Sequence, residues 1–163
     1  MRSAVRRALL AAGAGSLLAG CGFKLRQPPR LGFASIALTG FAPRSQMADA
    51  LRRELALQLQ VLDAPAKASV VLHALEDLRE RGVVVSTAAA QVREMQLRIK
   101  LTFRASTPGG RELIPRAELL ASRDLSYSET AALAKEEEQN ALYRDMQSDV
   151  VAQVLRRLAA VSV

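Results

Sequence analysis

Few residues of this sequence could do chemistry, and the first of them is a cysteine. Cys21 is the only cysteine in 163 residues, and it lies between Gly20 and Gly22, directly after an apolar run. A lone thiol has no disulfide partner within the chain, and a thiol that packs in a core is expected inside a periodic apolar segment. The residues that precede Cys21 therefore decide what its thiol does.

Those preceding residues have the pattern of a secretory signal. A basic start with three arginines leads into the apolar run 8–19, which is shorter than the roughly 20 residues of a membrane-spanning helix and has the length of a signal peptide's apolar region. The tetrapeptide "LAGC" at 18–21 resembles the bacterial lipobox, in which small residues admit the backbone to a peptidase and the thiol receives a diacylglycerol. We expect residues 1–20 to be a signal peptide and Cys21 to carry diacylglycerol and an N-acyl chain. The alternative is cleavage elsewhere, which leaves Cys21 as a free thiol.

The expected lipid places the protein at a membrane surface. Each buried CH₂ group contributes about 0.8 kcal/mol, so two or more acyl chains hold a protein stably. Gly22, rather than an aspartate, follows the cysteine, which resembles lipoproteins that are sorted to the outer membrane. We therefore expect a lipid-anchored protein on the periplasmic side of the cell outer membrane, with an arm at 21–32 and a single domain at 33–163.

Composition narrows the choice of partners. The chain has a formal net charge of +7, and residues 1–20 hold three arginines and no acidic residue, so the remaining 143 residues carry +4. This modest charge suits anionic partners. With no Trp, four Phe and two Tyr, the chain has few rings on which bases could stack, and we expect no nucleic-acid partner.

The sequence contains no recognisable catalytic or metal-binding pattern. His73, the only histidine, lies in an apolar segment, where a packed or surface-facing ring is expected. With one histidine and one acylated cysteine, a zinc site would need mostly carboxylates. The acidic run 136–138 is typical of a solvated helix N-terminus rather than of an acid–base pair. We therefore expect no enzyme, no metal and no cofactor besides the covalent lipid.

The clearest candidates for binding are cations on a strand. Within 91–106, apolar and polar residues alternate strictly over ten residues, which predicts a long strand with one buried and one wet face. The buried face is expected to hold Met95, Leu97, Ile99, Leu101 and Phe103. The wet face is expected to hold Glu94, Gln96, Arg98, Lys100, Thr102 and Arg104. Its basic row, Arg98, Lys100 and Arg104, either contacts an anionic partner or is a solvated strand face.

The elements that position this strand follow from the patterns around it. Residues 33–40 predict a short strand, and 42–60 predict a helix that ends near Pro65. The stripe of that helix is Met47, Leu51, Leu55 and Leu59. Residues 68–86 begin with a doubly apolar run typical of a central strand, and the turn 107–112 predicts a hairpin into a strand at 117–128. A long amphipathic helix is predicted at 129–158, with Met146, Val150, Val154 and Leu158 on one side.

This order of elements predicts the fold. Two amphipathic helices have stripes to bury, and the sheet has one apolar face to offer. We predict an α/β (α+β) two-layer sandwich, with two helices packed on one face of a roughly four-stranded mixed sheet and the other face left open.

Two stretches resemble a known family. "CGFKLR" at 21–26 is similar to the start of mature LptE, the lipopolysaccharide-assembly lipoprotein. "ALAKEEEQ" at 132–139, with the helix that follows, is similar to that family's C-terminal helix and its entry. The resemblance implies a non-enzymatic protein that plugs and assembles the outer-membrane β-barrel LptD and binds lipopolysaccharide. A barrel lumen is polar, so an open polar sheet face would suit it.

The resemblance also implies binding residues, since the phosphates of lipopolysaccharide favour Lys and Arg. Lys135 stands where the family places a basic residue tied to lipopolysaccharide binding, and Arg123 resembles a further basic position. Lys135 either binds phosphate or pairs with the glutamates that follow it. Arg98, Lys100 and Arg104 complete the set of candidates.

Two classes of function stay open from the sequence. The leading hypothesis is an assembly subunit for lipopolysaccharide export. The alternative is a scaffold lipoprotein of another envelope complex, for barrel folding or lipid shuttling, that does not bind lipopolysaccharide. A periplasmic hydrolase would need a nucleophile–base pair, which the sequence does not offer.

Overall fold

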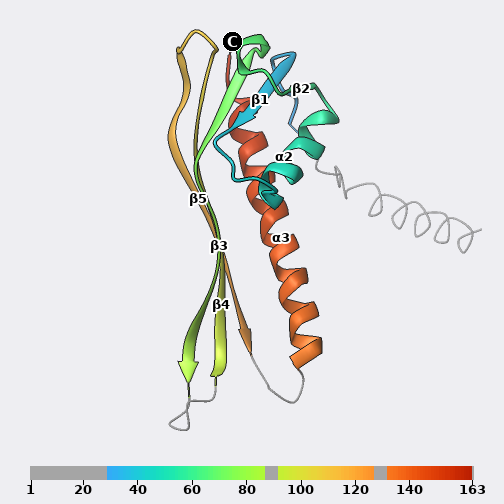
Figure 1. Ribbon diagram of the computed structural model, residues 1–163, viewed down its shortest axis with the longest axis vertical. Helices are drawn as coiled ribbons and strands as arrows, with labels where there is room; N and C mark the ends of the chain where they lie inside the picture. The colour runs from blue at the N-terminus through green and yellow to red at the C-terminus, as the bar shows by residue number, and fades with distance from the viewer. Residues whose placement is uncertain (1–28, 87–91, 127–131, 163) are drawn as a thin grey trace, which may run out of the picture.

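A computed structural model describes residues 29–86, 92–126 and 132–162, so the expected signal peptide, Cys21 and most of the expected arm lie outside the described residues. Within these ranges the chain forms one five-stranded sheet and two helices that lie on the same side of it (Figure 1). In chain order the elements are β1 (Ser35–Thr39), α2 (Gln46–Ala56), β2 (Gln60–Leu62), the short 3₁₀ turn η1 (Pro65–Lys67), β3 (Val70–Ser86), β4 (Val92–Ser106), β5 (Glu112–Ser126) and α3 (Ala132–Ala159).

The sheet is mixed, with the strand order β2-β1-β3-β4-β5. The short strand β1 pairs in parallel with both β2 and β3, whereas β3, β4 and β5 pair antiparallel. The predicted two-layer α+β sandwich with an open sheet face is therefore confirmed, and the apolar run that opens β3 does lie in a central strand.

The expected strand count was one too low, because the sequence reasoning missed β2. This strand has three residues and pairs only with the edge of β1, in the register Ser35↔Gln60. Three residues are too few to show a period, and an edge pairing of this kind depends on tertiary contacts. The first helix was also predicted to be too long. It ends at Ala56, and Leu59 packs against the core from the segment after it.

Helix α2 begins at Gln46, four residues after the start of the predicted helix, because Ser45 caps it. The Ser45 hydroxyl accepts a hydrogen bond from the backbone N–H of Ala48 (3.0 Å), which satisfies one of the free donors of the first turn. Asp49 in the first turn and Arg53 in the last complement the helix dipole. The spacing of four between its large apolar residues then turns one buried stripe toward the sheet.

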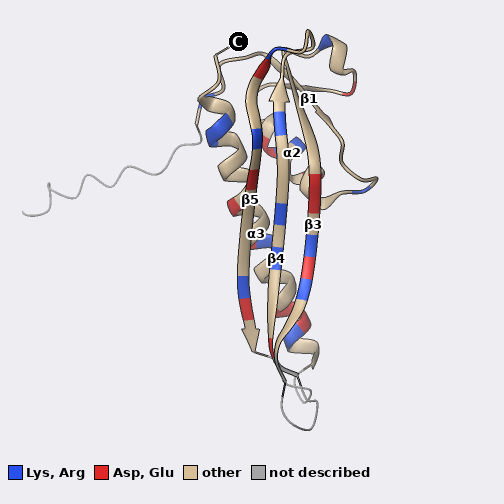
Figure 2. Ribbon diagram, turned by 90° about the vertical axis from the view of Figure 1, so that its left-hand side faces the viewer, with Lys and Arg blue, Asp and Glu red and all other residues tan. Residues whose placement is uncertain are grey.

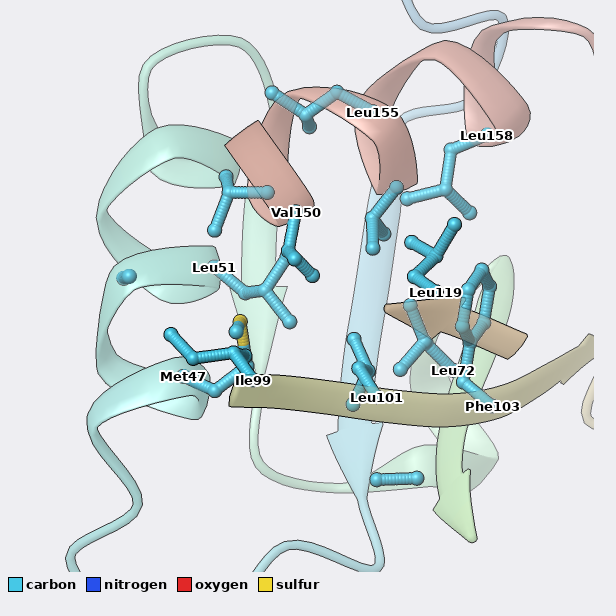
Figure 3. Close-up of a cluster of buried hydrophobic side chains, with 14 of the residues drawn as sticks. Met47, Leu51, Leu72, Ile99, Leu101, Phe103, Leu119, Val150, Leu155 and Leu158 are labelled. Carbon is cyan, nitrogen blue, oxygen red and sulfur yellow. The ribbon is translucent and has the colours of Figure 1, made fainter. Parts of the chain in front are cut away.

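The core lies between the helices and the sheet (Figure 3). All five apolar residues expected on the buried face of β4 are buried, and they meet the stripe of α3 that includes Met146, Val150 and Leu158. At about 25 cal/mol per Å² of apolar surface removed from water, this layer is the main source of stability. The strict alternation in β4 therefore predicted its two faces correctly.

Strands β4 and β5 form the expected hairpin. Gly110 adopts a φ of +91°, a left-handed conformation that a side chain would disfavour, and its N–H donates to the Thr107 carbonyl oxygen (3.0 Å). Strand β5 begins at Glu112, five residues before its predicted start. The three long strands extend well past α2, so the far half of the sheet is covered on the helix side by α3 alone (Figure 1).

Candidate functional site

A bulge in β3 decides which charged side chains face which side of the sheet. The pairing with β4 passes from Ala74↔Phe103 to Glu76↔Thr102, so Leu75 is an extra residue on β3. Before the bulge, alternate residues up to Ala74 face the helices. After it the alternation is inverted, so Asp77, Arg79 and Arg81 lie on the helix side, opposite buried residues of β4.

These inverted residues form a polar seam between β3 and the helices. Asp77 Oδ2 accepts a hydrogen bond from the hydroxyl of Ser45 (2.6 Å), the same hydroxyl that caps α2. The Arg79 guanidinium lies 3.8 Å from the ring centroid of Tyr143 on α3. The Tyr143 hydroxyl donates to the backbone carbonyl oxygen of Glu80 (2.6 Å). Sequence reasoning missed this seam, because a bulge leaves no periodic signal.

The other face of the sheet is not covered by either helix (Figure 2). Arg98, Lys100 and Arg104 of β4 lie on this open face, as predicted, because the alternating residues between them are buried under the helices. Arg98 and Arg104 are exposed and form no ion pair with any residue that the structure describes. Arg98 Nε donates to Gln96 Oε1 (2.6 Å). Their charges are therefore open to an anionic partner.

Lys100 differs from its two neighbours, because it is already paired. Its ammonium lies 2.8 Å from Glu76 Oε2 and 3.6 Å from Glu118 Oε2, which flank it on β3 and β5. The hydrogen bond from Lys100 lowers the pKa of Glu76 below its ordinary value, and Glu76 in turn raises the pKa of Lys100. Lys100 is thus the centre of an acid–base–acid cluster rather than a free cation.

The open face is less uniformly polar than the sequence predicted. Thr102, expected to be wet, is fully buried, because longer side chains lie across from it on both neighbouring strands and its hydroxyl donates to Glu76 (3.2 Å). Leu78 and Leu120, which lie across from Lys100, are 36% and 57% exposed. The ion cluster is therefore flanked by two apolar side chains.

Arg123 lies on the opposite side of the sheet from this row. It pairs with Leu97, a residue of the buried face of β4, and so it points toward α3. There its guanidinium lies 3.2 Å from Asp149 Oδ2 and also donates to the Ser122 carbonyl oxygen (2.9 Å). The structure therefore does not bring Arg123 together with Arg98 and Arg104.

Lys135 lies in the first turn of α3, near the end of β5. Its ammonium donates to Ser126 Oγ (3.1 Å) and to Glu138 Oε2 (2.8 Å), and its side chain is only 20% exposed. The pairing with a following glutamate, one of the two interpretations of the sequence, is thus present. An ammonium has three N–H donors, and these two contacts use two of them.

His73, the remaining candidate for chemistry, makes a structural contact. His73 Nδ1 lies 2.9 Å from the Thr39 hydroxyl across the β1–β3 pairing, which agrees with a packed ring. In the described parts of the chain, no group of three or more His, Cys, Asp or Glu side chains could hold a metal ion. No helix within the same ranges is long and apolar enough to cross a membrane.

The described residues thus form a small α+β domain with one helix-covered sheet face and one bare, charged sheet face. Comparison with known families places it further: residues 33–158 match the model of LptE, described as lipopolysaccharide-assembly, and the chain belongs to this family. A comparison with curated protein sequences gives no match.

Solved structures agree with this assignment. The solution structure of an uncharacterized lipoprotein B from Nitrosomonas europaea is 29% identical, covers 85% of this chain and 91% of its own, and has a TM-score of 0.72. Two further structures share the fold. Rare lipoprotein B from Shewanella oneidensis is 23% identical over 77% of this chain and 94% of its own, with a TM-score of 0.63. A minor lipoprotein from Acinetobacter baumannii is 21% identical over 80% and 93%, with a TM-score of 0.64.

Proposed function

We propose that this member of the lipopolysaccharide-assembly family is a lipid-anchored, non-enzymatic subunit of the outer membrane. In this proposal it binds lipopolysaccharide, and it plugs and helps to assemble the LptD barrel through which lipopolysaccharide reaches the outer leaflet. Cys21 carries the anchor, and the domain from residue 33 onward faces the periplasm and the barrel.

The proposed role as a barrel plug is supported by the uncovered face of the three long strands. A sheet face that both helices leave bare, and that presents Arg98 and Arg104 without ion pairs among the described residues, is suited to a polar surface of opposite charge. The lumen of an outer-membrane barrel is polar, and acidic groups in it would complement these arginines. The exposed Leu78 and Leu120 add apolar contacts to the same face.

The proposed lipopolysaccharide contacts are basic. Lys135 would donate its third N–H to a phosphate oxygen, or would exchange Glu138 for the phosphate. Arg98 and Arg104 are the next candidates, because their guanidiniums can form paired hydrogen bonds with phosphate oxygens. Lys100 and Arg123 would first have to leave their carboxylate partners.

Purification of the tagged chain from detergent-extracted membranes tests the plug and separates it from the scaffold alternative. We expect one large β-barrel protein to co-purify. A barrel-folding or lipid-shuttle complex in its place would favour the alternative function.

Replacement of Lys135 tests the ligand. Lys135→Glu is expected to weaken lipopolysaccharide binding by about tenfold, since a charge-assisted hydrogen bond to phosphate contributes about 1.5–3 kcal/mol, with little change in the melting temperature. The matched control is Lys67→Glu, the same charge reversal at an exposed lysine in η1. Equal binding by both variants would remove Lys135 from the site.

The anchor has its own test. Cys21→Ala should abolish the incorporation of labelled palmitate and leave an uncleaved precursor, because the acceptor thiol is missing. Normal labelling of this variant would contradict lipidation at Cys21.

A further inference from the structure

A cleft between α2 and α3 is independent of the open sheet face. The two helices lie side by side (Figure 1), and a cleft of about 370 Å³ opens between them and β3. Its lining includes six residues with charged or amide side chains from α2, β3 and α3 that the argument uses: Arg53, Arg79, Arg144, Asp49, Asn140 and Gln147. Three of these six residues are arginines, and they come from three different elements.

Helical spacing explains why polar side chains gather here. On α2, Gln46, Asp49 and Arg53 recur at intervals of three and four residues, which places them on one face of the helix. On α3, Asn140, Arg144 and Gln147 recur in the same way. Each helix therefore turns one polar stripe toward the other, beside the apolar stripe that it buries.

Two contacts hold the wall of the cleft in place. Gln147 Nε2 donates to the backbone carbonyl oxygen of Gln46 (2.9 Å), which ties α3 to the start of α2. The Arg79 guanidinium stacks on Tyr143 and donates to the side-chain oxygen of Gln46. Stacking fixes the plane of the guanidinium while its edge keeps further N–H donors. The cation from β3 is thus ordered without a carboxylate.

The charge in the cleft is not balanced from within. Arg53, Arg79 and Arg144 form no ion pair in the part of the chain that the structure describes. Asp49 is the one acidic residue among the lining residues, and Arg52 holds it at 3.2 Å. Three guanidiniums around a concave surface are the arrangement that binds the oxygens of a multiply charged anion.

We propose that this cleft binds a phosphate monoester carried on a saccharide. The three arginines contact the phosphate oxygens, and the amide of Asn140 meets sugar hydroxyls, joined by the oxygen and the second N–H of Gln147, whose first N–H donates to Gln46. The volume of the cleft leaves room for a polar ring beside the phosphate group. The site is separate from Lys135 and does not depend on the proposed function.

Titration of the full chain with glucose 1-phosphate tests the site. The protein is extracted in a non-ionic polyoxyethylene detergent, and the Nε–H signals of ¹⁵N-labelled arginines are followed by NMR. We expect saturable shifts with glucose 1-phosphate, weaker binding of inorganic phosphate and no shifts with glucose. Arg53→Gln/Arg144→Gln should weaken the binding of glucose 1-phosphate by at least about tenfold. The control Arg157→Gln, at an exposed arginine in the last turn of α3, should leave it unchanged.

Each other result overturns part or all of the inference. Absence of saturable shifts, or unchanged binding by the double variant with its melting temperature preserved, would remove the site. Equal affinity for inorganic phosphate and glucose 1-phosphate would remove the saccharide from the proposal. The outcome is distinguishable from that of Lys135→Glu, because that variant leaves the cleft intact.

Discussion

The two faces of the sheet hold their charged residues in different ways. On the helix side, charges are tied to the helices: Asp77 to the cap of α2, and Arg123 to Asp149 on α3. Each of these contacts joins the two layers, so it can form only when the sandwich is assembled. The charged residues on the helix side therefore help to hold the folded structure together.

On the open side, charge stays within the sheet or stays unpaired. Lys100 pairs only with glutamates of the neighbouring strands, and Arg98 and Arg104 form no ion pair with described residues. Among the described residues, no ion pair on this side joins the two layers. The open face can therefore change its partners at little cost to stability, which is what a binding face needs.

The largest loss of stability is expected from a charge placed in the core. Leu101 is fully buried on the helix side of β4, and Leu101→Asp places an unpaired carboxylate in the core. We expect a loss of at least about 4 kcal/mol in the free energy of unfolding, a large part of the roughly 5–15 kcal/mol that stabilises a domain. The control Arg98→Asp, on the open side of the same strand, should change it by less than about 0.5 kcal/mol. Urea denaturation followed by circular dichroism measures both, and a Leu101→Asp variant as stable as Arg98→Asp would mean that the faces are reversed.

Removal of a contact that joins the two layers should cause an intermediate loss of stability. The Ser45 hydroxyl both caps α2 and donates to Asp77 on β3, so Ser45→Ala removes a cap and leaves that carboxylate without its partner. We expect a loss of about 1–2 kcal/mol in the free energy of unfolding. The matched control is Ser122→Ala on the open side of β5, where the same atom is removed at an exposed position. Similar losses from both substitutions would show that the two sides are equivalent.

The sequence predicted the layers and the face of the basic row, but not the pairing of its members. Strict alternation in β4 and the four-residue spacing in α3 each leave one buried side, whatever the rest of the chain does. The partners of Lys100 depend instead on the register of three strands, which places Glu76 and Glu118 across from Thr102, diagonal to Lys100 on the same face. Register depends on how the patterns of two strands match and on the turn between them, so it is not visible in one segment.

The bulge at Leu75 shows the same limit from the other side. In residues 68–86 apolar and charged residues do not alternate strictly, so no sequence pattern marks where the faces are exchanged. Without the bulge, Glu76 would face the helices and Asp77 the open side. One inserted residue therefore decides that Arg79 reaches Tyr143 and lines the cleft between the helices.

The smallest change in stability is expected from the acid–base–acid cluster around Lys100, and this change should depend on pH. A pKa of Glu76 below 4.5 means that its ionised form stabilises the folded state. This contribution is present above pH 4.5 and is lost as the pH falls through the folded-state pKa. The raised pKa of Lys100 adds a contribution that is complete below pH 10.5 and disappears only above it, so neutral solution retains both.

Glu76→Gln should therefore lower stability slightly at pH 7, and its difference from the unsubstituted chain should shrink below pH 4.5. Urea melts at pH 7, 4.5 and 3 measure this. In a Lys100→Met background the same substitution should lose most of its pH dependence, because the hydrogen bond that lowers the pKa of Glu76 is gone. An undiminished pH dependence in that background would assign it to a group other than this pair. A loss at pH 7 as large as that of Ser45→Ala would mean that open-face charge is also part of the fold, and the contrast between the two faces would fail.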